Sequence, residues 1–136
     1  MRPFERWTAL YARFALGTTF LVEVADRFGW LGSAGGWKTF ANFTAYTAKV
    51  NSFMPPATIP FLAWAATAAE SYFGVMLILG WWPRSTAIGS AVLLALFGTA
   101  MAVSFGVKSP LDYSVFSASA AALLLAGVAG RVTERR

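Results

Sequence analysis

The chain of 136 residues contains no cysteine and no histidine. Without cysteine it forms no disulfide and offers no thiolate. Without either residue it lacks the usual ligands of structural zinc, of iron–sulfur clusters and of most haems. We therefore expect no metal site in this chain. Any redox centre that works with it must belong to a partner protein or to a bound small molecule.

Charge is also scarce, because only 12% of the residues are Asp, Glu, Lys or Arg. In contrast, 57% of the residues are hydrophobic, and the mean hydropathy is +0.58. A soluble domain of this size needs more polar side chains to cover its surface. We therefore interpret the chain as an integral membrane protein. Anionic lipid headgroups account for the net charge of +5, so we expect a lipid bilayer and no nucleic acid around it.

Four apolar segments each supply the residues, about 20 in number, that a helix needs to cross the roughly 30 Å hydrocarbon core of a bilayer. They are continuously apolar rather than alternating, which favours helices over barrel strands. The sequence thus predicts an all-α membrane protein with a single domain, residues 1–136, built as an antiparallel bundle of four transmembrane helices. The predicted spans are residues 7–26, 59–82, 85–107 and 110–129.

Basic residues near the ends of these spans predict the orientation of the chain. If the four helices alternate in direction, more basic residues fall on the side of the two termini than on the other side. We therefore expect a multi-pass protein of a bacterial or archaeal cytoplasmic membrane, with both termini in the cytoplasm. The first group is Arg2, Arg6, Arg84, Arg131, Arg135 and Arg136, and the second is Arg27, Lys38, Lys49 and Lys108.

The first connection, residues 27–58, is long, rich in glycine, and closes on Pro55 and Pro56. Aromatic residues at positions 37, 40 and 43 predict a short helix within it, lying on the outer membrane interface. Two interpretations of this helix stay open. It either caps the bundle or acts as a lid over a ligand site, because lids over buried sites tend to be long connections.

Glu70 lies near the middle of the second predicted span. An ionisable group at that depth is expensive in a bilayer and indicates a function, with a partner to be found. Near the outer end of the first span, Glu23 and Arg27 lean toward the same outer half of the bundle. They are four residues apart, which is the spacing of an ion pair on a helix surface. Arg13 lies nearer the cytoplasmic end, and we expect it to extend to the headgroups.

Two interpretations of Glu70 stay open as well. In the first, its carboxyl group only joins two helices, hydrogen-bonded to a hydroxyl such as that of Thr67 or Ser71. In the second, it exchanges protons or binds a polar ligand in an interior cavity. Quinone chemistry needs such a group, because reduction takes up protons and a quinone carbonyl needs a hydrogen bond inside an apolar pocket. The candidate ligand-binding residues are Glu70, Tyr72, Phe73, Trp64, Glu23 and Arg27, with Glu70 also the candidate catalytic residue.

The stretch from Ala69 to Arg84 resembles the DoxX family of small four-helix membrane proteins. The family hallmark is a glutamate in an apolar helix, two later glycines, and an arginine at the turn into the third helix. A further arginine and glycine match the opening of the first helix. Many members carry a His-Gly pair and a lysine after that helix, where this chain has residues 26–30. The matching residues are Arg13, Gly17, Glu70, Gly74, Gly80 and Arg84.

The resemblance implies a relation to the membrane subunits of thiosulfate:quinone oxidoreductases. Our leading hypothesis is an accessory membrane subunit of a quinone-linked redox complex, rather than an enzyme that acts alone. It would offer a quinone-adjacent pocket and a docking surface to other subunits, with no covalently bound cofactor. Two other classes stay open: a non-catalytic scaffold or assembly subunit, and a small proton-coupled transporter.

Overall fold

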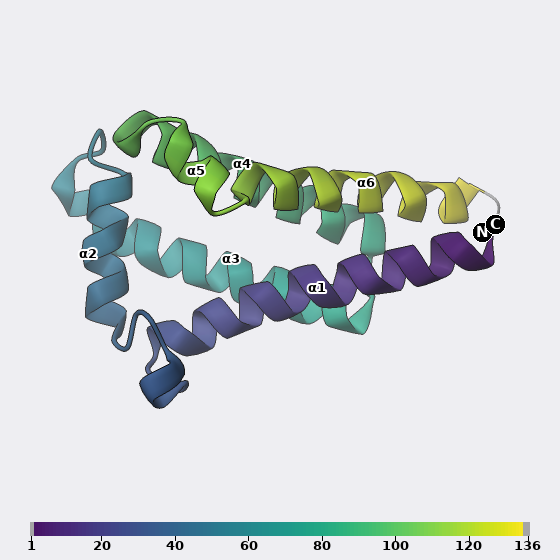
Figure 1. The fold of residues 1–136 in the computed structure, drawn as a ribbon, viewed down its shortest axis with the longest axis horizontal. Coiled ribbons are helices and arrows are strands. Elements are labelled where there is room, and N and C mark those ends of the chain that lie inside the picture. Colours follow the sequence, from purple (N-terminus) through teal and green to yellow (C-terminus); the bar gives the residue numbers. More distant parts are fainter. Residues whose placement is uncertain (1, 135–136) are drawn as a thin grey trace.

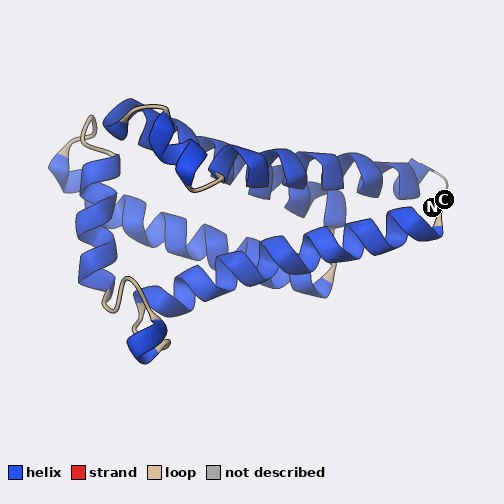
Figure 2. Ribbon diagram, viewed as in Figure 1, coloured by secondary structure: helices blue, strands red, loops and turns tan. Residues whose placement is uncertain are grey.

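The computed structural model describes residues 2–134, all of whose regular elements are helical (Figures 1 and 2). The predicted all-α fold is thus confirmed for these residues. Arg135 and Arg136, which entered the orientation argument, lie outside them. The elements are α1 (Pro3–Arg27), η1 (Gly32–Ala34), α2 (Phe40–Val50), η2 (Pro56–Thr58), α3 (Ile59–Leu79), α4 (Pro83–Phe105), α5 (Lys108–Asp112) and α6 (Val115–Glu134).

The four long helices form two pairs, in which α1 packs on α3 and α4 packs on α6. The short turn between α3 and α4 joins the pairs, and α1 also contacts α6. Figure 1 shows α2 lying across the end of the bundle that is far from the two chain termini. The buried core between the long helices includes Leu16, Phe20, Leu77, Ala91 and Leu125.

Two helical stretches are long and apolar enough to cross a membrane, Pro56–Leu79 and Pro83–Phe105. A shorter apolar helix covers Val115–Arg131, whereas charged side chains lower the hydropathy of α1. Large apolar side chains on the outside of α4 and α6, such as Leu96 and Leu124, are exposed, as side chains that face lipid are. Two candidate spans are therefore present by length and composition, and the four-span topology stays a prediction.

The last helix begins later than the predicted start at residue 110. The chain instead forms the short helix α5, and Ser114 follows with a φ of 55° before α6 begins. A residue in the left-handed region cannot continue a right-handed helix, so the break falls there. Within α5, Lys108 Nζ pairs with the carboxylate of Asp112 at 2.7 Å, and both side chains are exposed.

Close approach of α1 and α3 depends on two glycines of the family hallmark. A Cβ atom at Gly17 would lie 3.0 Å from the carbonyl oxygen of Gly74 and 2.9 Å from Cδ1 of Ile78. A Cβ atom at Gly74 would lie 2.8 Å from Cγ of Leu21. The missing side chains therefore let the two backbones pack closely, which is a common device where helices meet in membranes.

Arg13, which we expected to extend to the headgroups, caps the end of α3. Its Nε donates a hydrogen bond to the carbonyl of Leu77 at 3.0 Å, and its Nη2 donates to that of Ile78 at 3.2 Å. The last carbonyls of a helix have no partner within it, and a cation there also suits the helix dipole. Gly80 follows with a φ of 74°, and a side chain at this position would collide with the Arg13 guanidinium.

The last hallmark arginine, Arg84, lies in the first turn of α4 and is exposed. Its guanidinium lies over Gly130 of α6, where a Cβ atom would be 3.3 Å from its Cζ. The hallmark residues other than Glu70 thus all lie at helix contacts or helix ends. Their positions have a structural explanation without any ligand.

Replacing Gly74 by leucine should destabilise the fold, because the new side chain overlaps Leu21 at the crossing of α1 and α3. We expect the free energy of unfolding to fall by about 1–3 kcal/mol, as overpacking of a core usually costs. The matched control is Gly127→Leu in α6, where nothing lies within 4 Å of an added Cβ atom. Unfolding in mild detergent by titration with SDS measures both variants, and an equal effect at the two positions would contradict the close crossing.

Candidate functional site

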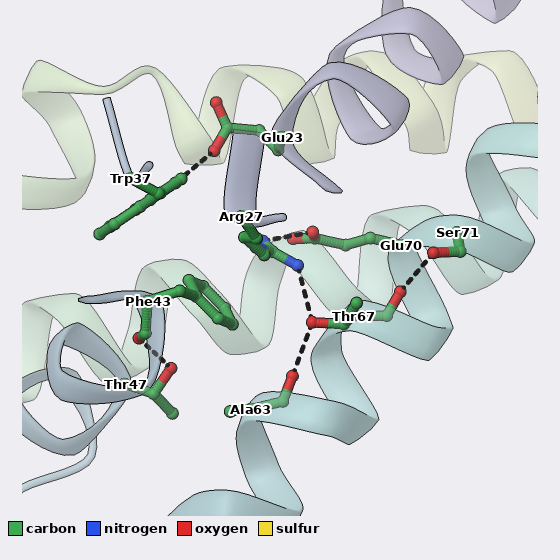
Figure 3. Close-up of polar contacts among 9 residues, drawn as sticks. All are labelled: Glu23, Arg27, Trp37, Phe43, Thr47, Ala63, Thr67, Glu70 and Ser71. Atoms are coloured by element: carbon green, nitrogen blue, oxygen red, sulfur yellow. Dashed lines mark hydrogen bonds and ion pairs between the residues drawn. The ribbon is translucent and has the colours of Figure 1, made fainter. Parts of the chain in front are cut away.

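The centre of the candidate site is an ion pair that joins α1 to α3 (Figure 3). Nη2 of Arg27 contacts Oε2 of Glu70, and the two side chains are 4% and 6% exposed. The predicted pair between Glu23 and Arg27 is wrong, because Arg27 turns to α3 instead. Two charges removed from water need a partner of opposite sign, and here each supplies it for the other.

The hydroxyl group of Thr67 in α3 holds Arg27 in place. Its Nη1 donates to the Thr67 hydroxyl at 3.2 Å, and that hydroxyl donates to the carbonyl of Ala63 at 2.8 Å. Ser71 donates to the carbonyl of Thr67 at 2.7 Å (Figure 3). One donor is left over, because Nε of Arg27 is buried and has no acceptor among the described residues. Most buried N–H groups are hydrogen-bonded, so this exception needs an explanation.

The short helix α2 covers Arg27 from the other side. Cζ of the guanidinium lies 3.7 Å from the centre of the Phe43 ring, which is the geometry of a cation–π contact. Phe43 is buried, and its carbonyl accepts a hydrogen bond from the Thr47 hydroxyl at 2.9 Å. The contact therefore ties the position of α2 to the ion pair beneath it.

Further rings extend this cover into an aromatic layer, made of Phe28, Trp37, Phe40, Phe43, Tyr46 and Trp64. Phe40 stacks on Trp64 with 4.2 Å between ring centroids and on Phe28 with 5.5 Å. Burial raises the pKa of the Tyr46 hydroxyl. The predicted helix of the first loop is thus present as α2, and its position at a membrane interface stays a prediction.

Two carboxylates of α1 fasten the loop that leads into α2. Glu23 Oε2 accepts a hydrogen bond from the indole Nε1 of Trp37 at 3.1 Å. Asp26 accepts the backbone N–H groups of Gly36 at 2.9 Å and Trp37 at 3.2 Å. Sequence reasoning missed this role of Asp26. The available signal was the Gly35-Gly36 pair, because a side chain at Gly35 would collide with the Asp26 carboxylate.

The structure brings together only some of the predicted ligand-binding residues. Arg27 and Glu70 are in contact, whereas Glu23 and Trp64 reach the site through the aromatic layer. Tyr72 is 52% exposed on the outside of α3, with its ring edge-on to Phe73 at 5.4 Å. The Phe73 ring packs on Gly89 of α4. Tyr72 and Phe73 therefore do not join Glu70.

The arrangement places a buried carboxylate next to a buried N–H donor under a layer of aromatic rings. The N–H group can donate a hydrogen bond to a polar atom of a ligand, and the carboxylate can accept one from the same atom. The carboxylate can also exchange a proton. Among the described residues, no group of three or more Asp or Glu side chains is placed to hold a metal ion. The donor and the carboxylate thus suit polar recognition and proton exchange.

Comparison with known proteins assigns most of the chain to a protein family. The family model DoxX matches residues 8–104, which run from the first third of α1 to the end of α4. This range includes the ion pair, the aromatic layer and all the hallmark residues. Neither a curated protein nor a solved structure matches the chain.

Removing one member of the ion pair should be far more harmful than removing both. Arg27→Leu leaves the Glu70 carboxylate buried without its partner, and we expect a loss of about 3–5 kcal/mol in the free energy of unfolding. The double variant Arg27→Leu with Glu70→Leu should recover most of that loss, because an apolar pair of similar volume replaces the charges.

The control breaks the exposed pair of α5 by Lys108→Leu, which should change stability by less than about 0.5 kcal/mol. SDS titration in mild detergent compares the free energies of unfolding of the parent, Arg27→Leu, the double variant and Lys108→Leu. A double variant no more stable than Arg27→Leu, or an Arg27→Leu protein as stable as the parent, would contradict the assigned pair.

Asp26→Ala should loosen the loop before α2 without unfolding the bundle. Two backbone N–H groups lose their acceptor, and each such loss is worth about 1 kcal/mol or more. We expect hydrogen exchange at Gly36 and Trp37 to accelerate by about tenfold. Asp26→Asn keeps one acceptor oxygen, so the N–H groups of Gly36 and Trp37 should exchange at a rate between those of the parent and of Asp26→Ala. Asp112→Ala in α5 serves as the control. Unchanged exchange in Asp26→Ala would refute the fastening role.

Proposed function

The chain belongs to the DoxX family of membrane proteins, and from this premise we propose that it is an integral membrane subunit of a quinone-linked redox complex. In this proposal it is an accessory subunit. It contributes a quinone-adjacent site around Arg27 and Glu70, and a docking surface for the other subunits. The electrons come from a redox centre in a partner protein.

The observation that carries the proposal is the spare donor at the ion pair. Nε of Arg27 is buried without an acceptor among the described residues, and it belongs to the same guanidinium that contacts Glu70. An apolar membrane ligand with a carbonyl oxygen would satisfy this donor. The neighbouring carboxylate would then accept a hydrogen bond from the same oxygen once it becomes a hydroxyl group.

A quinone supplies the redox chemistry when bound, taking two electrons from the partner and two protons to become the quinol. Arg27 binds and orients the carbonyl oxygen through its free N–H group. Glu70 is the group that would exchange a proton at this oxygen. Thr67 keeps the guanidinium in place while the charge on Glu70 changes.

The aromatic layer supports the same proposal because it offers surfaces on which a flat ligand ring can pack. The stacked rings of Phe28, Phe40 and Trp64 are flat apolar surfaces, and Trp64 is exposed on the outside of the bundle. Flat conjugated rings pack well on such surfaces. A ligand held there would lie next to the helix α2 that covers Arg27, so α2 would act as a lid as well as a cap.

A second function is favoured by the ion pair itself. Glu70 is engaged by Arg27 within the chain, so its carboxylate already has a structural task in joining α1 to α3. This favours a scaffold or assembly subunit without a ligand. The two functions differ in one result: where the Glu70→Gln protein is folded and its complex is intact, a scaffold still supports its partner as the parent does.

The proposed function predicts that the chain, purified in mild detergent with its partners, carries a quinone that mass spectrometry of the lipid extract identifies. In the isolated complex, Glu70→Gln should lower quinone-dependent turnover by about a hundredfold or more, because glutamine cannot exchange the proton. Asp112→Asn removes an exposed carboxylate of α5, whose partner is Lys108, and should leave turnover unchanged.

Two outcomes would contradict this function. Recovery of neither a quinone nor a redox partner from folded protein would remove the basis of the proposal. Unchanged turnover in Glu70→Gln, with an intact complex, would reduce Glu70 to a helix link and would favour the scaffold. Circular dichroism of each variant establishes that the helices are intact.

A further inference from the structure

A cavity lies beside the first half of α1, at the end of this helix away from the aromatic layer. Its volume is about 480 Å³, and its lining comes from one face of the first half of α1. The lining combines two positive charges with apolar and aromatic side chains. Its residues are Pro3, Arg6, Trp7, Ala9, Leu10 and Arg13.

The positive charges of this cavity are available to a ligand. The side chain of Arg6 is exposed and makes no hydrogen bond or ion pair with the side chains that the structure describes, those of residues 2–131. Arg13 uses Nε and Nη2 to cap α3, which leaves its Nη1 without an acceptor in the same part of the chain. The nearest acid along the helix, Glu5, pairs with Arg131 at 3.5 Å. An anion in the cavity would therefore meet two guanidinium groups on the same helix face.

Aromatic residues place the cavity at the level of lipid headgroups. Trp7 lines it and is 71% exposed. Trp81 and Trp82, in the turn between α3 and α4, are also exposed, and this turn follows the end of α3 that Arg13 caps. Exposed tryptophans of a membrane protein gather where the hydrocarbon meets the headgroups. The guanidinium groups and the apolar lining thus meet at that boundary.

We propose that this cavity is a binding site for an anionic phospholipid. Arg6 and Arg13 hold the phosphate, since guanidinium forks match its oxygens. Trp7 and Leu10 contact the glycerol and the first carbons of the acyl chains. A free phosphate would make no contact with the apolar half of the lining. We therefore assign the site to the phosphate of a lipid rather than to a free phosphate ion. The proposal is independent of the quinone site.

The test measures lipid binding to the full chain in mild detergent by native mass spectrometry. Phosphatidylglycerol should bind more tightly than phosphatidylcholine. Arg6→Gln should weaken phosphatidylglycerol binding about fivefold, which is the usual effect of one basic residue near an anionic membrane surface. The matched control is Lys49→Gln, which removes one exposed positive charge from α2 at the opposite end and should leave binding unchanged. Arg6 is exposed, so its variant keeps the fold.

Trp7→Gln tests the apolar half of the site and should weaken phosphatidylglycerol binding, with inorganic phosphate as the competing probe. Equal binding of phosphatidylglycerol and phosphatidylcholine would overturn the site. So would a loss of binding in Lys49→Gln as large as that in Arg6→Gln, because it would indicate a general attraction between the basic chain and anionic lipids. Displacement of the lipid by inorganic phosphate at millimolar concentration, with no effect of Trp7→Gln, would overturn the lipid as the ligand.

Discussion

The ion pair between Arg27 and Glu70 is the interaction on which the arrangement of the outer half of the bundle depends. Neither charge is stable alone in an apolar interior, so the last residue of α1 must lie beside the middle of α3. This requirement fixes how far α1 extends along α3. Phe43 then packs on the guanidinium, so the position of α2 follows from the same contact.

The charged residues of α1 show how one helix organises the others. Arg13 caps α3, Glu23 holds the Trp37 indole, Asp26 holds the loop before α2, and Arg27 pairs with Glu70. Each charge satisfies a polar group of another segment of the chain. This explains why α1 is the least hydrophobic of the long helices, and why hydropathy alone selects α3 and α4 as candidate spans.

The sequence predicts the helices well and the side-chain partners less well. Apolar runs and aromatic spacing indicate the long helices and α2, because these signals are local. The partner of Arg27 is not a local property: Glu23 has the right spacing, and the crossing at Gly17 and Gly74 brings Glu70 closer. Helix geometry already indicates that Tyr72 does not lie beside Glu70. Two residues along a helix turn the side chain by about 200°, to the opposite face.

Stability alone does not explain why a charged pair lies at this position. A pair of apolar side chains of similar volume often stabilises a buried contact as well as an ion pair or better. Glycines already bring α1 and α3 together, so the pair is not needed to attach them. A purely structural pair would also gain from an acceptor for the Arg27 Nε, which is left without one among the described residues. A polar ligand that accepts this hydrogen bond would account for both features.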